Sequence, residues 1–243
     1  MKEQKYYGIH ACQALWKKRP QDVIRVYIDE SNVKEFAPLL KWCAQNKKAY
    51  HIIPSTELDK VTDSVHHEGI CILAKELKAL TEREFISQLG KWGSKICLLY
   101  LDGVQNPHNI GSIVRTAAHF GIPFILGEKL PALSPAACRI AKGGAEIVRL
   151  VYLQNPLETL RSLKEKKFAL IGTSSHKGTS LYQFPFPSQS IIAIGAESTG
   201  LGVPLQRLIA GSIKIPGTDS IESLNVSVAS ALCIGEYCRQ HLV

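Results

Sequence analysis

The stretch NPHNIGSIVRTAAHFG, residues 106–121, closely follows the apolar segment ICLLYLDG, residues 96–103. It begins with the turn-forming run Asn106-Pro107-His108-Asn109 and continues with helical periodicity. The apolar positions on one helical face are Ile110, Ile113, Val114, Ala117 and Ala118. Arg115 lies off that face. Open α/β proteins place their sites at strand–turn–helix junctions of this kind. The stretch therefore predicts an α/β fold with a site at this turn.

The composition is typical of a soluble globular protein, and we expect neither a membrane span nor a membrane partner. Of 243 residues, 45% are hydrophobic and 21% charged, and no apolar run reaches the roughly 20 residues of a membrane span. We expect no signal peptide and a cytoplasmic location. The net charge of +8 is compatible with a polyanionic partner without requiring one. The seven cysteines include no C-x-x-C pair, which favours reduced, buried thiols over disulfides or a metal site.

Strand-like and helix-like segments alternate along the whole chain. Helices are expected over 32–46, with Pro38 inside that run, and over 81–94, where Thr81 and Glu84 form a capping box. In the first part, strands are expected over 23–29, 49–54 and 68–75; in the second, over 95–102, 123–127, 147–153, 168–175, 190–197 and 212–216. Continuous apolar runs in the second part predict parallel strands that are covered on both faces. We expect a domain over 1–76, a linker over 77–93 and a second domain over 94–243.

The familiar nucleotide and hydrolase motifs do not occur in the chain. The sequence has no G-x-x-x-x-G-K-[ST], no G-x-G-x-x-G after a strand and no H-E-x-x-H. The segment GAESTG is not the G-x-S-x-G of a nucleophile elbow. The common enzyme classes are therefore not indicated.

Three segments at strand ends resemble the motifs of the SpoU-type RNA ribose methyltransferases of the SPOUT superfamily. They are LDGVQNPHNIGSIVRTAAHFGI (101–122), IGAESTGL (194–201), and IP followed by SLNVSVA (223–229). Near the start, YYGIHACQALWKK and HHEGICILAK (66–75) are similar to the family's small substrate-binding domain. The resemblance thus covers essentially the whole chain.

The resemblance implies a small α/β substrate-binding domain followed by an α/β methyltransferase domain whose C-terminal part forms a trefoil knot. It implies S-adenosylmethionine as cofactor, no metal, rRNA or tRNA as substrate, and a homodimer. The expected reaction is methylation of a ribose 2′-hydroxyl. The last helix, which should begin near Ser223 or Asn225, is apolar on more than one side, as a helix that also meets a partner subunit would be.

Five residues are candidates for the chemistry: Asn109, Arg115, Glu197, Ser223 and Asn225. Arg115 can hold a phosphate with two parallel N–H donors and stabilise a developing alkoxide, although a solvated helix arginine is the alternative. Asn109 either caps its helix or touches the substrate. Glu197 orients Arg115 or nearby loop amides. Ser223 and Asn225 are candidates both for helix caps and for contacts with the reacting groups.

Seven residues are candidates for cofactor binding. They are Thr173, Gly195, Ala196, Gly200, Leu201, Ile215 and Leu224. Glycines let a ligand lie against the backbone, but they also occur simply as turn residues. Ile215 and Leu224 are equally consistent with core positions.

Two residues depart from the family motifs, and two other functions are alternatives to a ribose methyltransferase. Asp219 stands where the family usually has a small residue, and Glu68 stands where Gln is usual. The first alternative is a non-catalytic RNA-binding or ribosome-assembly factor on the same fold, which would have no need of all five candidate residues. The second is a base methyltransferase, against which SLNVSVA points to ribose.

Overall fold

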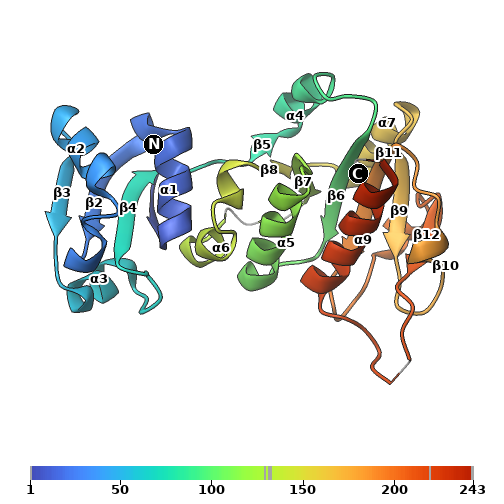
Figure 1. Ribbon diagram of the computed structural model, residues 1–243. Helices are drawn as coiled ribbons and strands as arrows, with labels where there is room; N and C mark the ends of the chain where they lie inside the picture. The colour runs from blue at the N-terminus through green and yellow to red at the C-terminus, as the bar shows by residue number, and fades with distance from the viewer. Residues whose placement is uncertain (1, 129, 131–132, 219, 242–243) are drawn as a thin grey trace.

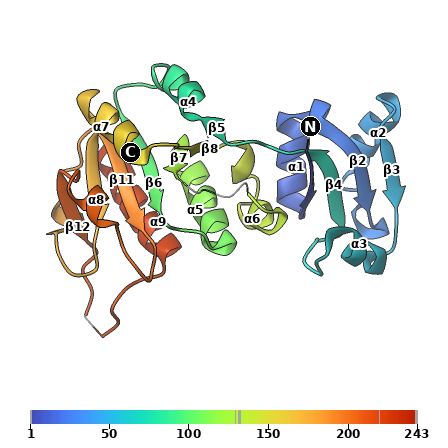
Figure 2. The ribbon, with the colours of Figure 1, turned by 180° about the vertical axis from the view of Figure 1, so that it is seen from behind.

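The computed structural model describes residues 2–128, 130, 133–218 and 220–241. Asp219 lies outside these residues. Figure 1 and the reverse view in Figure 2 show two domains side by side, with α6 and α5 between the first domain and the far end of the second sheet.

The first domain is a four-stranded sheet with order β1-β4-β2-β3 and helices packed against it. β4 is antiparallel to β1 and β2, while β2 and β3 are parallel. The elements are β1 Glu3–Tyr7, α1 Ile9–Lys18, η1 Pro20–Asp22, β2 Val23–Ile28, η2 Glu30–Asn32, α2 Ala37–Gln45, β3 Ala49–Ile52, α3 Ser55–Thr62 and β4 Ile70–Lys75. The strands expected over 23–29, 49–54 and 68–75 are confirmed.

The helix expected over 32–46 is shorter than its sequence pattern suggested. Asn32 is the last residue of the separate turn η2, in which the Asp29 side chain accepts a hydrogen bond from the Asn32 backbone N–H, and residues 33–36 form a further turn. The helix α2 then begins at Ala37 with Pro38 in its first turn. Proline is tolerated there because the first N–H groups of a helix need no partner within the helix.

The second domain is an eight-stranded sheet with order β10-β12-β9-β11-β6-β7-β8-β5. Every adjacent pair is parallel, as the continuous apolar runs predicted. The elements are β5 Leu80–Thr81, α4 Glu82–Leu89, β6 Ile96–Asp102, α5 Pro107–His119, β7 Phe124–Gly127, α6 Pro135–Ile140, η3 Gly144–Glu146, β8 Arg149–Tyr152, α7 Pro156–Glu165, β9 Ala169–Thr173, β10 Thr179–Ser180, η4 Leu181–Gln183, β11 Gln189–Gly195, α8 Val203–Gln206, β12 Gly211–Lys214 and α9 Val226–His241.

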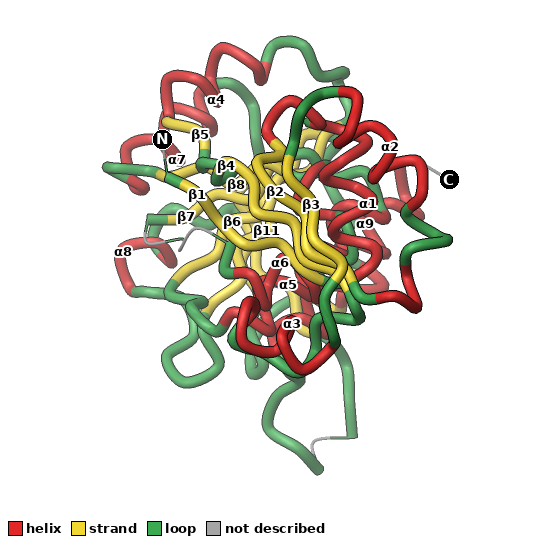
Figure 3. The backbone as a smooth tube through the Cα atoms, turned by 90° about the vertical axis from the view of Figure 1, so that its left-hand side faces the viewer, coloured by secondary structure: helices red, strands yellow, loops and turns green. Residues whose placement is uncertain are grey.

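The central strands β6 and β11 are buried on both faces, which explains why their sequences do not alternate. Leu99 and Ile192 face a core cluster that includes the buried side chains of α5 and α9. Leu98 and Ile191 face a second cluster that includes residues of α4 and α7. Figure 3 shows the resulting arrangement, with strands in the middle and helices on both sides.

Residues 77–93, expected to be a linker, contribute two elements. β5 pairs with β8 at the edge of the second sheet. The helix α4 begins with the capping box predicted from the sequence, in which Thr81 N–H donates to Glu84 Oε2 at 2.7 Å and Glu84 N–H donates to Thr81 Oγ1 at 3.3 Å.

Three expectations about composition can be compared with the described residues. All seven cysteines are free and buried, as predicted. Within the described ranges, no helix is long and apolar enough to cross a membrane. In the same residues, no group of three or more His, Cys, Asp or Glu side chains is placed to hold a metal ion.

Candidate functional site

A cavity of about 830 Å³ opens at the carboxyl ends of β9, β11 and β12. Because the three strands are parallel, the segments that leave them meet at this one edge of the sheet. All seven predicted cofactor residues line the cavity: Thr173, Gly195, Ala196, Gly200, Leu201, Ile215 and Leu224. Its volume falls within the range of sites for small organic ligands.

The loop after β11 folds tightly back on its own strand. Ala196 and Gly200 form an isolated antiparallel bridge, and Gly200 N–H donates to the Ala196 carbonyl at 2.8 Å. A Cβ on Gly195 would lie 2.3 Å from the Gly200 carbonyl carbon, and Gly200 itself has φ +62°. Gly195 is therefore required by close backbone approach, whereas Gly200 suits a left-handed turn.

Asp102, at the end of β6, holds the same loop from the side. Its Oδ2 accepts a hydrogen bond from Gly202 N–H at 2.7 Å, and its carbonyl accepts one from Ala196 N–H at 2.9 Å. The sequence analysis missed this residue. The available signal was an acidic side chain at the carboxyl end of an apolar strand, one residue before Gly103.

Three of the five catalytic candidates meet in one hydrogen-bonded cluster. Glu197 Oε1 accepts from Asn225 Nδ2 at 2.8 Å, from Val226 N–H at 3.1 Å and from Asn109 Nδ2 at 3.4 Å. Asn225 Nδ2 also donates to Asn109 Oδ1 at 3.0 Å. The cluster ties α5, the loop after β11 and the start of α9 together. The partners of Glu197 are thus the amide groups of Asn109, Asn225 and Val226, and it makes no bond with Arg115 among the described residues.

The sequence left open which residues cap the starts of α5 and α9, and the structure gives a different answer for each helix. Asn106, not Asn109, caps α5, since its side chain accepts a hydrogen bond from His108 N–H at 2.9 Å. The capping role considered for Asn109 is therefore wrong. Asn225 does precede the first residue of α9, and its Oδ1 accepts from Ser227 N–H at 2.9 Å. Asn225 thus serves both as a cap and as a member of the cluster.

The other two candidates lie outside the cluster. Ser223 is exposed and lines the cavity beside Leu224. Arg115 is exposed on α5. Its side chain has no hydrogen bond or ion pair with any part of the chain that the structure describes. An exposed guanidinium without a partner in the protein is available to an anionic ligand.

Comparison with known proteins identifies the family. Residues 96–235 match the SpoU rRNA Methylase family, and residues 6–80 match the RNA 2′-O ribose methyltransferase substrate-binding family. The chain belongs to the SpoU rRNA methylase family. All of the cavity-lining residues belong to the part that matches the methylase domain.

Relatives within the SpoU family cover both domains. The "Uncharacterized tRNA/rRNA methyltransferase YfiF" of Escherichia coli O157:H7 is 35% identical over 98% of this chain and 69% of its own length. The 23S rRNA (guanosine-2′-O-)-methyltransferase RlmB of Shewanella oneidensis is 33% identical over 96% of each chain. The SpoU methyltransferase AviRb of Streptomyces viridochromogenes, solved with AdoMet, has a similar fold, with a TM-score of 0.77 at 20% identity over 98% of this chain and 90% of that one.

Proposed function

We propose that this protein transfers the methyl group of S-adenosylmethionine to a ribose 2′-hydroxyl of rRNA or tRNA. The observation that carries the proposal is the cavity at the carboxyl edge of the sheet, with the Asn109–Glu197–Asn225 cluster beside it. Family membership supports the same chemistry.

The cavity fits the cofactor in size and in the character of its walls. Exposed backbone around Gly195 and Gly200 can lie against an adenosine, and Leu201, Ile215 and Leu224 offer apolar surface to the base. When bound, S-adenosylmethionine supplies an electrophilic methyl group on a sulfonium. The positive charge on the sulfonium sulfur makes that methyl group a target for an oxygen nucleophile.

The residues of the chain then position the nucleophile. Asn109, Glu197 and Asn225 fix the position of the α5 N-terminus relative to the cavity wall. We assign Arg115 to the phosphate next to the target ribose, where its charge stabilises the negative charge that builds on the 2′-oxygen as this oxygen bonds to the methyl group and releases its proton to water. A free arginine is a poor base, so its role is electrostatic. Ser223, at the cavity wall, is assigned to orienting the ribose.

The direct test is a comparison of RNA from cells with and without the gene. Mapping of 2′-O-methyl groups in total RNA should show one or more sites that vanish on deletion and return with the wild-type gene. Calorimetry with EDTA present should show binding of S-adenosylmethionine. No binding at millimolar ligand would instead support the RNA-binding factor without catalysis.

The proposal extends to the path of the chain. β11 lies between β9 and β6, and the chain returns after β12, which lies between β10 and β9, so that α9 packs against α5 and β11. A segment inserted between strands formed earlier, followed by such a return, agrees with the expected trefoil knot. We further propose a homodimer, because Val228, which does not line the cavity, remains 48% exposed near the start of α9. We also propose a cytoplasmic location, with which an rRNA or tRNA substrate is consistent.

A further inference from the structure

The two domains are joined by a buried ion pair. Arg19, the residue after α1, donates from Nε to Glu146 Oε2 at 2.8 Å and from Nη2 to Glu146 Oε1 at 3.0 Å. The two side chains are only 7% and 5% exposed. Arg19 Nη1 also donates to the Lys75 carbonyl at 2.6 Å, and its guanidinium lies 4.8 Å from the centre of the Tyr6 ring. Two parallel bonds fix both the distance and the orientation of the partners.

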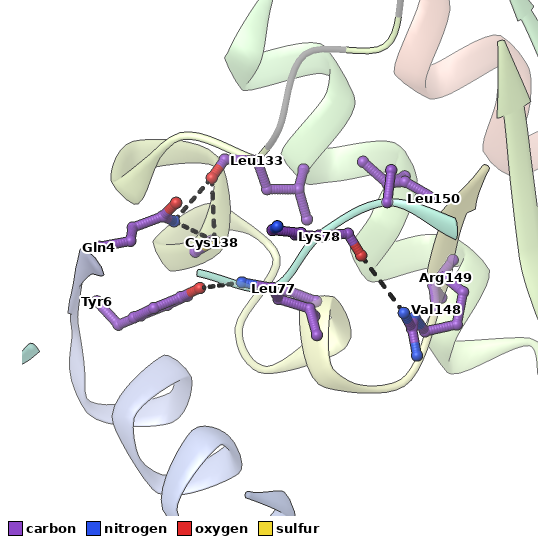
Figure 4. Close-up of a pocket in the computed structure, with 11 residues that line it drawn as sticks. Gln4, Tyr6, Leu77, Lys78, Leu133, Cys138, Val148, Arg149 and Leu150 are labelled. Atoms are coloured by element: carbon purple, nitrogen blue, oxygen red, sulfur yellow. Dashed lines mark hydrogen bonds between the residues drawn. The ribbon is translucent and has the colours of Figure 1, made fainter. Parts of the chain in front are cut away.

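Further contacts surround this pair. Gln4 Nε2 donates to the Leu133 carbonyl at 2.8 Å, and Tyr6 Oη accepts from Leu77 N–H at 3.1 Å, as Figure 4 shows. The cavity left among these side chains measures about 20 Å³, close to the space of a single water molecule. These side chains therefore leave little unfilled space between them.

A second ion pair crosses the junction with the charges reversed. Glu68 of the first domain lies 3.6 Å from Arg139 Nη1 of α6, and its Oε2 accepts from Ile9 N–H at 2.9 Å at the start of α1. Glu68 stands where the family usually has Gln. Glu in place of Gln at position 68 thus adds an ion pair between the domains.

The turn formed by Gly143 and Gly144 lies between α1 of the first domain and α5, the helix that carries Arg115. A Cβ on Gly143 would lie 2.7 Å from Ala14 Cβ of α1, and a Cβ on Gly144 would lie 3.3 Å from Arg115 Cα. Lys142, which lies between α6 and this glycine turn in the sequence, is exposed and has φ +45°. The turn is therefore in close contact with α1 on one side and with α5 on the other.

We propose that Arg19 and Glu146 are positioning residues that fix the two domains as one preformed RNA-binding surface, with Arg115 and Lys142 on it. This inference rests on the proposed function, since it names the part of the chain that aligns the RNA. A preformed surface does not lose the entropy of ordering two mobile domains when it binds. The RNA should therefore contact the first domain, Lys142 and Arg115 together.

The test of rigidity is a distance distribution by double electron–electron resonance. Nitroxides are placed at two exposed helix positions, Lys41→Cys in α2 and Arg161→Cys in α7. An excess of unlabelled chain removes distances between protomers. We expect one narrow distribution in the otherwise wild-type protein and a broad one with Glu146→Gln or Arg19→Met. A broad distribution without those changes would overturn the proposal.

The test of function separates KM for RNA from kcat. Glu146→Gln should raise KM for RNA about tenfold and leave kcat at saturating RNA and the cofactor Kd within twofold. Arg19→Lys should not restore KM, because an ammonium cannot make two parallel bonds. Lys142→Ala should raise KM without broadening the distance distribution. Unchanged KM in these variants would refute the positioning role.

One further variant serves as a control, and another replaces Arg19→Met if that variant does not fold. Lys2→Met removes an exposed ion pair with Glu76 that does not reach the second domain, and it should change neither readout. If Arg19→Met fails to fold, Glu68→Gln keeps the hydrogen-bond acceptor for Ile9 and should still broaden the distribution. If the wild-type protein methylates no RNA, the proposed function fails, while RNA affinity by filter binding and the distance distribution still decide this inference.

Discussion

Arg115 is an exposed side chain, and the role we propose for it depends on its charge. It lies off the buried face of α5 and has no bonding partner among the described residues, so Arg115→Ala should leave stability unchanged. Removing a preorganised charge from a developing alkoxide should lower the single-turnover rate by about 10²–10³. Arg115→Lys should restore little of it. A variant that keeps more than about a third of the rate would show Arg115 to be a solvated helix residue, and an unchanged cofactor titration is the control.

Glu197 is the acceptor at which three elements meet. Glu197→Ala leaves Val226 N–H and two amide side chains without their carboxylate, and hydrogen bonds to charged groups contribute about 1.5–3 kcal/mol each. Because Glu197 and Asn225 are exposed to water, we expect a smaller net loss of about 0.5–1.5 kcal/mol in the free energy of unfolding. Glu197→Gln should lose less, since its amide oxygen still accepts. Urea unfolding with both variants measures the difference, and equal losses would contradict it.

At the scale of elements, the loop after β11 depends on the absence of one side chain. Gly195→Ala places a Cβ 2.3 Å from the Gly200 carbonyl carbon, so the loop must shift. We expect the affinity for S-adenosylmethionine to fall at least tenfold by calorimetry. Gly93→Ala is the matched control, because a Cβ there meets no atom within 4 Å. Binding unaltered by Gly195→Ala would mean that this loop does not form the cofactor site.

The sequence predicted most elements of the fold but not their ends. Apolar periodicity identified β6, α5 and β11, because each buries a face or both faces. It missed β1, whose sequence Glu3-Gln4-Lys5-Tyr6-Tyr7 is polar and becomes a strand by pairing with β4 some 70 residues further along. Strand formation there depends on a distant partner, and no local pattern records it.

For the candidate site, too, the sequence predicted some residues and missed others. Motif resemblance selected seven of the residues that line the cavity and the three that form the cluster. It did not indicate Asp102, nor that Asn106 rather than Asn109 caps α5, since both depend on how backbone groups are oriented. The ion pair of Arg19 with Glu146 was likewise not foreseen, because pairs of charges far apart in sequence leave no local signature.

At the scale of the whole molecule, the oligomeric state can be tested through α9. Val226, Cys233 and Tyr237 are buried in the chain, while Val228 is half exposed on the same helix. Light scattering at tens of micromolar should give the mass of two chains. Val228→Asp should shift the equilibrium towards the monomer, because a buried charge without a partner opposes association. A monomer mass for the wild-type protein would refute the proposed dimer.

The seven buried thiols predict how the protein responds to pH. Burial raises the pKa of Cys43 to about 11 and that of Cys71, Cys138 and Cys233 to about 12. At pH 8 the native protein should thus react slowly with a disulfide reagent, and all seven thiols should react after unfolding. Above about pH 9 the unfolded chain loses thiol protons that the native protein keeps, so stability should fall as pH rises. Rapid native reaction of several thiols would contradict this.

The central position of β11 has a consequence for the order of folding. Its Ile192 pairs with Leu99 of β6, and its other edge pairs with β9, so β11 takes its place only after distant parts of the chain have come together. Loop closure over such separations slows folding. A nascent chain that has emerged past β6 but not past β11 exposes an unpaired, apolar strand edge to solution. During synthesis, that interval is when the chain is most exposed to aggregation and when a chaperone should bind it.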